Sequence, residues 1–121
     1  MNDPKKHSKL NQLFIERLTS IIMDEMSLGK ISLEMVASKM FITRGQLNRK
    51  VKAITGRTTQ QFAMKVRLTH ASNLLKNNTD MAISEIAFRC GFEDATSFSR
   101  AFRRTFGKSP SQYRNETQNV I

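Results

Sequence analysis

The sequence predicts an all-α fold of about seven helices, in which two similar helical subdomains are joined by a long linker helix. Three observations support this prediction. Apolar residues recur at helical spacing along almost the whole chain, without the alternation that marks strands. Glycines and polar capping residues divide this pattern into segments. The two halves of the chain also match each other at a nearly constant offset.

The first half of the chain is expected to form three helices, each bounded by residues that start or stop a helix. Gly29 ends a first amphipathic helix, whose apolar side chains begin at Leu10. Ser32 is the expected N-cap of a short second helix. A capping box, Thr43–Gln46, starts the third helix, and Gly56 stops it. The residues expected in the first core are Leu10, Leu13, Phe14, Leu18, Ile21, Ile22, Met26, Met35, Val36, Met40, Leu47 and Val51.

The second half begins with a long helix, which the capping box Thr58–Gln61 opens and which is expected to run to Lys76. A polar stretch then separates it from a short helix that Gly91 stops. Asp94 caps the next helix. A last brief helix starts at Ser109–Gln112, with proline at its first helical position. The apolar residues of this half are Phe62, Val66, Ala71, Leu74, Leu75, Ile83, Ile86, Ala87, Phe98, Phe102 and Phe106.

An internal repeat relates the two halves. Ala37 matches Ala87 fifty residues on, and Arg49 matches Arg100 fifty-one residues on. Each copy has a short helix, a turn, a longer helix and a glycine stop, which is the plan of a helix-turn-helix. The predicted divisions are a polar segment over residues 1–9, a first helix-turn-helix subdomain over 10–57, a linker helix over 58–76, a second subdomain over 77–115 and a frayed C-terminus over 116–121.

Charge and cysteine content restrict the partners. The net charge of +10 and the pI near 10.4 indicate a polyanionic partner, either nucleic acid or an anionic membrane surface. No apolar run approaches the roughly 20 residues that span a bilayer, so no membrane-spanning segment is expected. Of the two polyanions, nucleic acid is the expected partner, and no membrane partner is expected. The single cysteine, Cys90, excludes an internal disulfide, suits a reducing cytoplasm and is expected to be a small buried residue.

The sequence offers no candidate for catalysis. Gly107-Lys108-Ser109 resembles the end of a phosphate-binding loop, but Phe102 stands where that loop needs its first glycine. The histidines are isolated, and Cys90 has no neighbours at metal-ligand spacing. We therefore expect no catalytic residue, no metal and no cofactor, and no enzyme activity.

Three segments of the second half resemble the DNA-binding domains of the AraC/XylS family of bacterial regulators: Ile83–Phe92, Ser97–Arg104 and Phe106–Arg114. The resemblance extends from Leu10 to Arg114. It implies a sequence-specific transcription regulator domain that binds double-stranded promoter DNA, with RNA polymerase as a further partner. It also implies a cytoplasmic, nucleoid-associated protein whose sensor or receiver domain lies outside this chain. The first helix is similar to output domains of hybrid two-component regulators.

The second helix of each helix-turn-helix unit, the recognition helix, is expected to enter the major groove. There arginine can chelate guanine, and asparagine or glutamine can chelate adenine. The expected base-contacting residues are Arg44, Gln46, Asn48 and Arg49 in the first subdomain and Thr96, Ser97, Ser99 and Arg100 in the second. The residues expected to contact phosphates, which position the protein without specifying sequence, are Lys50, Lys52, Arg57, Arg103, Arg104 and Lys108. Because the two sets differ, we expect an asymmetric site that a monomer can cover. Two alternatives remain open: a nonspecific architectural DNA-binding protein, or the targeting module of a larger DNA-modifying enzyme.

The first subdomain departs from the family pattern at three positions. Phe41 stands where the second copy has the turn glycine Gly91, and a left-handed conformation costs a non-glycine residue roughly 1–2 kcal/mol. Because of this cost, the backbone of the first turn is open to a path different from that of the second turn. Val51 stands where an aromatic residue is usual, which predicts a less filled first core. Gly45 leaves an early recognition-helix position without a side chain.

Overall fold

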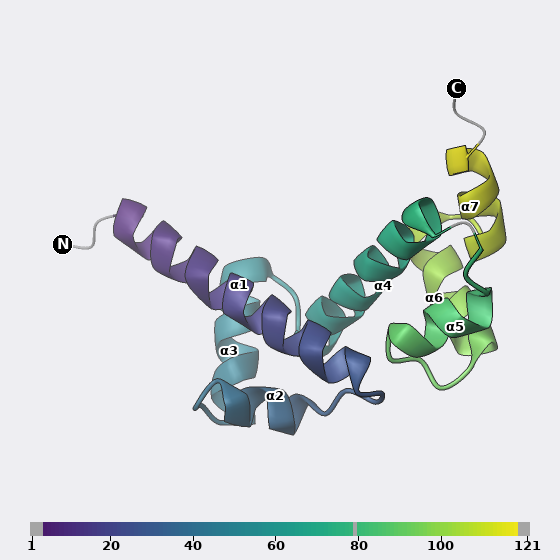
Figure 1. The fold of residues 1–121 in the computed structure, drawn as a ribbon. Coiled ribbons are helices and arrows are strands. Elements are labelled where there is room, and N and C mark those ends of the chain that lie inside the picture. Colours follow the sequence, from purple (N-terminus) through teal and green to yellow (C-terminus); the bar gives the residue numbers. More distant parts are fainter. Residues whose placement is uncertain (1–3, 79, 119–121) are drawn as a thin grey trace.

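The computed structural model describes residues 4–78 and 80–118, and over these residues it contains seven helices and no strand (Figure 1). The all-α prediction is confirmed. The helices are α1 (Pro4–Ser27), α2 (Leu33–Lys39), α3 (Arg44–Thr55), α4 (Thr59–Asn77), α5 (Ile83–Arg89), α6 (Ala95–Phe106) and α7 (Pro110–Gln118).

The first subdomain packs α1, α2, α3 and the N-terminal half of α4 around one apolar cluster. Val51 is fully buried in this cluster, and Phe62 of α4 adds an aromatic ring to it. Burying a side chain of this size contributes about 1.5–3 kcal/mol, so this shared core holds the four helices together. The buried members are Leu18, Ile22, Val36, Ala37, Leu47, Val51, Phe62 and Ala63.

The second subdomain packs the C-terminal half of α4, α5, α6 and α7 around a more aromatic cluster. The ring centroids of Phe98 and Phe102 are 5.7 Å apart, and Tyr113 of α7 lies 5.3 Å from Phe102 in an edge-on arrangement. These separations are in the range that favours aromatic pairs. Met26 of α1 also belongs to this cluster, so the two subdomains share more than α4.

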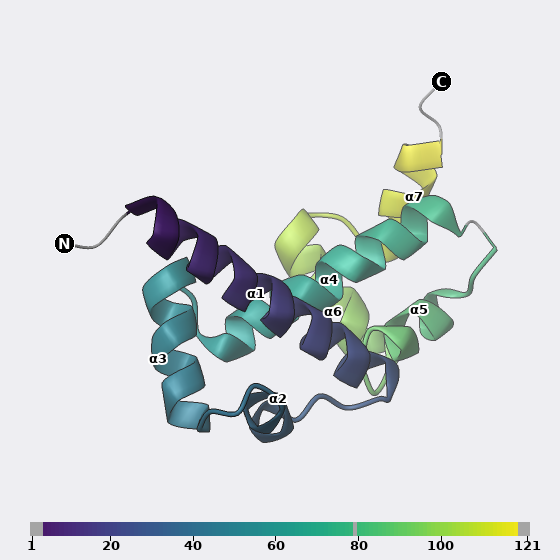
Figure 2. The same ribbon diagram turned by 60° about the vertical axis from the view of Figure 1, so that its left-hand side comes forward.

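The internal repeat continues beyond the recognition helices and also includes α1. Arg17-Leu18-Thr19 of α1 recurs as Arg67-Leu68-Thr69 of α4, and the Thr58–Phe62 segment recurs as Ser109–Tyr113. The C-terminal half of α4 therefore takes the place of α1 in the second subdomain, while its N-terminal half corresponds to α7. Figure 2 shows α4 running from the first subdomain into the second. The predicted linker helix is thus part of both cores.

The two helix-turn-helix turns follow the same path. Phe41 has a φ of 60° and Gly91 a φ of 82°, both left-handed. Ile42 N–H donates to Ala37 O at 3.2 Å, as Phe92 N–H donates to Ala87 O at 3.0 Å. The first turn is therefore not altered by its phenylalanine, whose side chain is 86% exposed and meets no steric obstacle.

Three expectations about the first subdomain were wrong. Helix α1 begins at Pro4, inside the segment expected to be a polar linker. Leu10 and Leu13 are 55% and 51% exposed, and neither belongs to the apolar cluster that Phe14, Ile15 and Leu18 of α1 join. Met35 is 49% exposed, since α2 buries only Val36 and Ala37. At the other end, α7 includes residues 116–118 of the segment expected to be frayed, and residues 119–121 lie outside the described residues.

Candidate nucleic-acid interface

Helices α3 and α6 are matched in length and in the way they begin and end. Each has 12 residues and stops at a left-handed glycine, Gly56 or Gly107. Thr43 and Gln46 form the predicted capping box, with the Gln46 N–H donating to Thr43 Oγ1 at 3.1 Å and the Thr43 N–H to Gln46 Oε1 at 2.9 Å. These local contacts fix where the exposed side chains of α3 begin.

The N-cap of α6 is charged. The Asp94 carboxylate accepts the Ser97 N–H at 2.7 Å, and this hydrogen bond lowers the pKa of Asp94. The positive charge of Arg100, one turn further along α6, also lowers the pKa of Asp94. A carboxylate at this position is also favoured by the helix dipole, so α6 begins with a rigid, negatively charged cap beside its first exposed residues.

One face of each helix is buried and the opposite face is exposed. Leu47 and Val51 of α3 are buried, as are Phe98 and Phe102 of α6. With about 3.6 residues per turn, the residues opposite them are 45, 49 and 52 in α3 and 96, 100 and 103 in α6. The side chains on these exposed faces are Arg49 and Lys52 in the first subdomain and Thr96, Arg100 and Arg103 in the second.

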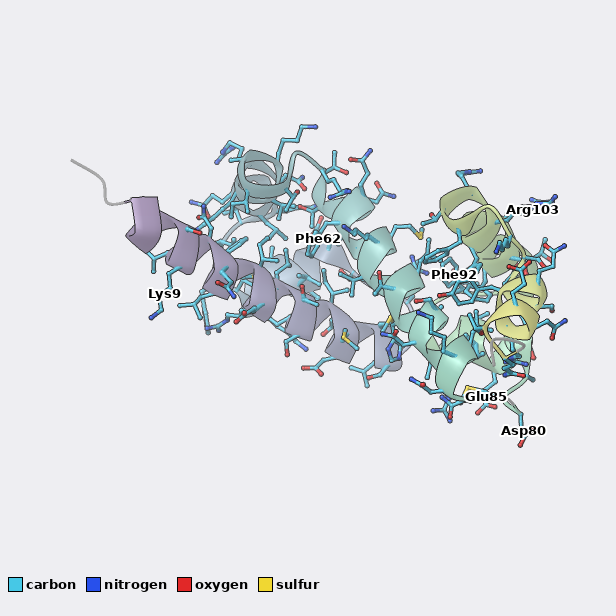
Figure 3. The ribbon with its side chains drawn as sticks, turned by 90° about the horizontal axis from the view of Figure 1, so that it is seen from above. Lys9, Phe62, Asp80, Glu85, Phe92 and Arg103 are labelled. Atoms are coloured by element: carbon cyan, nitrogen blue, oxygen red, sulfur yellow. The ribbon has the colours of Figure 1, made fainter. Side chains whose placement is uncertain are left out.

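The two exposed faces belong to the same side of the molecule. In Figure 1, α3 lies behind α1 and α6 lies behind α5. Seen from above in Figure 3, both helices lie along the same edge, with the N-terminal half of α4 between them and Arg103 projecting outward. Three neighbouring hollows lead from α3 to α6, and residues of α4 recur in their linings: Gln60, Met64 and Arg67. We call this depression the α4 trough.

The structure brings most of the predicted base-contacting residues of α3 together. Arg44, Asn48 and Arg49 line one hollow with Lys52, between α3 and the start of α4. Arg44 Nη1 also lies 3.7 Å from Glu34 Oε1, in an exposed pair. Gln46 lies on the other flank of α3, and its amide oxygen closes the capping box. It must share or release that hydrogen bond to chelate a base.

In α6 the predicted residues are smaller and more spread out. Thr96, Ser97 and Arg100 are exposed, whereas Ser99 is half-buried. Ser97 lines the end of the α4 trough, and the outward face of α6 presents Thr96 and Arg100. Arg100 is therefore the long side chain near the centre of this face.

Three of the predicted phosphate-contacting cations already have intramolecular partners. Lys50 Nζ lies 4.5 Å from the centroid of the Phe14 ring, and Lys52 Nζ donates to Gly56 O at 3.0 Å. Lys108 is paired with Glu116. Within residues 8–78 and 80–118, no ion pair involves Arg57, Arg103 or Arg104. Of the six predicted phosphate-contacting residues, these three arginines have no acidic partner within the described part of the chain.

Sequence reasoning missed the contribution of Arg67. Its guanidinium donates to two backbone carbonyls of the second turn, Cys90 O at 2.9 Å and Gly91 O at 2.7 Å. The recurrence of Arg-Leu-Thr at residues 17–19 and 67–69 was a signal that could have drawn attention to it. Cys90 itself is buried, as predicted, and burial raises its pKa to about 12.

Comparison with known proteins identifies the family. A family model described as a helix-turn-helix domain matches residues 36–116. The chain belongs to the AraC-type helix-turn-helix family. The transcriptional activator RhaS of Salmonella schwarzengrund is 35% identical to this AraC-type domain over 94% of the chain, which spans 38% of that relative's length.

Solved structures support the assignment of this AraC-type domain. The C-terminal domain of AraT, a response regulator from Geobacillus stearothermophilus, is 32% identical, with 84% of each chain covered and a TM-score of 0.74. The DNA-binding domain of AdpA, solved in complex with a target DNA, is 25% identical, with 86% of this chain and 92% of that chain covered and a TM-score of 0.75. The chain is an AraC-type helix-turn-helix DNA-binding domain.

Among the helices of the described residues, none is long and apolar enough to cross a membrane.

Proposed function

We propose that this domain binds an asymmetric promoter site as a monomer, with α3 and α6 inserted into successive major grooves on one face of the duplex. The observation that carries the proposal is that the exposed faces of α3 and α6 lie along the same edge of the molecule (Figure 3). Helix α4 has 19 residues, which span about 28 Å at about 1.5 Å per residue. That length is compatible with the roughly 34 Å that separate successive turns of B-DNA.

The two helices divide the recognition of the site. In the first subdomain Arg44, Asn48 and Arg49 carry side chains long enough for bidentate contacts, each worth roughly 1–3 kcal/mol of discrimination between bases. Gln46 contributes once its amide leaves the capping box. In the second, Thr96, Ser97 and Ser99 favour close approach, contacts with thymine methyl groups and water-mediated contacts, and Arg100 adds one long donor.

Phosphate contacts hold the domain in place. Arg57, Arg103 and Arg104 are the first candidates, because the described structure pairs none of them with an acidic side chain. Lys50, Lys52 and Lys108 contribute after exchanging a weak exposed intramolecular contact for a phosphate, since exposed pairs are worth only about 0–1 kcal/mol. Such contacts position the protein but carry no sequence information.

The domain acts as the output part of a larger regulator. RhaS is a transcriptional activator and AraT is a response regulator, which supports an activator role with RNA polymerase as partner and a sensor or receiver domain elsewhere in the protein. The proposed site of action is the bacterial nucleoid, in the cytoplasm. The relatives are transcription regulators, which supports a binding function without catalysis.

Selection of bound duplexes from a random pool tests the proposal. We expect one asymmetric consensus, bound at least about 10³-fold more tightly than unrelated DNA, as is typical of specific binding. The affinity should be measured at several salt concentrations, because phosphate contacts alone give strongly salt-dependent binding to any sequence. Equal affinity for selected and scrambled duplexes would instead identify a nonspecific architectural protein, and a symmetric site that needs two copies would contradict the monomer.

A further inference from the structure

We propose that Arg67 is a positioning residue that fixes α6 relative to α3, and that it thereby sets the spacing between the two half-sites that the domain accepts. The proposal rests on the proposed binding of α3 and α6 in successive major grooves. Arg67 itself contacts neither recognition helix through a hydrogen bond in the described structure; it acts through the turn that precedes α6.

The guanidinium of Arg67 clamps this turn to α4. Its Nε donates to Cys90 O at 2.9 Å and its Nη2 donates to Gly91 O at 2.7 Å. Its Cζ lies 3.9 Å from the centroid of the Phe92 ring, which lies beside α4 in Figure 3. One side chain thus holds three consecutive residues. The planar fork of arginine can bind two neighbouring carbonyls at once, whereas the point charge of lysine cannot reproduce that geometry.

The cost of placing this charge indicates that the contact is specific. Arg67 is partly buried, and burial lowers its pKa because the charged form loses water. Two carbonyl acceptors and an aromatic face replace that hydration. Cys90 does not supply a counter-charge at neutral pH, since burial raises the pKa of its thiol to about 12 and the thiol stays neutral. The partners of Arg67 are therefore the backbone and the ring of the turn.

The same turn also touches the first subdomain. A Cβ atom at Gly91 would lie 3.1 Å from Gly29 O, in the connection between α1 and α2, and 3.5 Å from Met26 Cγ. Lys30 Nζ lies 3.6 Å from Glu93 Oε1. The turn is therefore enclosed between α4, through Arg67, and the end of α1. A shift of the turn would change the contact between the two subdomains.

The first subdomain shows that the clamp is not needed to build such a turn. Arg17 occupies the position equivalent to Arg67, but its Cζ lies 5.9 Å from the Phe41 ring and it makes no hydrogen bond to the first turn within the described residues. The first turn nevertheless has the same backbone hydrogen bonds as the second. The additional bonds of Arg67 thus serve the placement of the second turn rather than its formation.

Placement of the turn determines the placement of α6. Asp94, the N-cap of α6, follows Phe92 by two residues, and Thr96 and Arg100 lie in the first two turns of the helix. A displacement of the turn would therefore carry the base-contacting residues of α6 with it. If the duplex is held at α3, such freedom lets α6 reach half-sites at more than one distance.

The test compares Arg67→Lys and Arg67→Met with the unaltered domain on duplexes derived from the selected site. In this series the two half-sites are moved apart or together by one base pair, which is about 3.4 Å and one tenth of a turn. Lys65→Met is the matched control, because it removes one positive charge from an exposed position on the opposite side of α4. Thermal unfolding shows which variants are folded. If Arg67→Met is unfolded, the result for Arg67→Lys decides the test.

We expect the unaltered domain and Lys65→Met to lose about tenfold in affinity for each one-base-pair change, a typical cost of a misplaced contact. In Arg67→Lys and Arg67→Met the affinity for the best spacing falls, and the ratio between spacings falls to about threefold or less. The salt dependence of binding stays unchanged, because no phosphate contact is lost.

Two outcomes would overturn the positioning role while leaving the proposed function intact. One is an equal loss of affinity at every spacing. The other is a salt slope smaller by about 0.9, which would show that Arg67 itself neutralises a phosphate. An unaltered domain without any spacing preference would instead contradict the two-groove binding itself, and the positioning role with it.

Discussion

At the residue scale, Phe41 and Gly91 have the same left-handed backbone conformation in different surroundings. Both lie in the left-handed region at equivalent positions of the two turns. Gly91 is buried, and a Cβ atom at this position would lie only 3.1 Å from Gly29 O. Phe41 points into solvent, so its strain is purely local. Glycine is required in the second turn by the neighbouring backbone as well as by φ.

This contrast predicts opposite tolerances to alanine. Gly91→Ala should destabilise the fold by about 1–2 kcal/mol from the left-handed conformation alone, and by more once the backbone at Gly29 has to move. Phe41→Ala should change stability by no more than about 0.5 kcal/mol, because the strain is already present and the side chain is exposed. Urea unfolding of both variants measures the difference. A loss limited to about 1–2 kcal/mol in Gly91→Ala would show that the close approach to Gly29 adds nothing to the cost of the left-handed conformation, and equal destabilisation at the two positions would contradict that cost as well.

Residue-level predictions from the sequence succeeded where the chemistry is local. The Thr43 and Asp94 caps form as predicted, because a cap depends on residues within one turn of each other. Leu10, Leu13 and Met35 were assigned to the core and are exposed, since periodicity shows which residues share a face but not whether another helix covers it. Arg67 was missed because its hydrogen-bond partners lie 23 and 24 residues away in the sequence, and a local pattern does not show such contacts.

At the element scale, the caps of equivalent helices differ between the two subdomains. Ser32 caps α2, with its side chain accepting the Met35 N–H at 3.3 Å. Ala82 occupies the equivalent position before α5 and offers no side-chain acceptor, although its backbone is extended in the same way. Helix α5 therefore begins without the contact that starts α2. No cap residue was predicted for α5, and Ala82 makes no side-chain cap hydrogen bond.

Supplying the missing cap should stabilise the second subdomain. We expect Ala82→Ser to raise the free energy of unfolding by about 0.5–1 kcal/mol, because serine accepts a free backbone N–H of the first turn. Ser32→Ala, the reverse change at the equivalent position, should lower it by a similar amount. Chemical denaturation of the two variants checks both signs. A loss of stability in Ala82→Ser would mean that the start of α5 is held by contacts that the hydroxyl disturbs.

Helix α4 was predicted from the sequence as a linker helix, but its membership of both cores was not. Its start is the predicted Thr58–Gln61 capping box, and its end, Asn77, is one residue beyond the expected Lys76. It was expected to be the linker helix, and the structure adds that Phe62 belongs to the first core and Leu68 to the second. A helix that is shared by two cores couples the positions of the subdomains.

At the scale of the whole molecule, two similar subdomains present different surfaces to the same edge. The outward face of α3 carries Arg49 and Lys52, with a glycine, Gly45, at its first outward position. The outward face of α6 carries Thr96, Arg100 and Arg103. Because Arg49 and Arg100 are equivalent in the repeat, they are the pair best suited to report separately on the two half-sites.

Single substitutions of these two arginines should therefore relax sequence preference in two separate places. We expect Arg49→Ala to weaken the preference at one or two base pairs of one half-site, and Arg100→Ala at one or two base pairs about one helical turn away, each costing about 1–3 kcal/mol on the selected site. Selection experiments with each variant map the affected positions. Lys65→Ala, on the opposite side of α4, is the control and should leave the consensus unchanged. Loss of preference at the same positions in both variants would show that α3 and α6 contact one groove segment, or equivalent halves of a symmetric site, rather than two successive grooves.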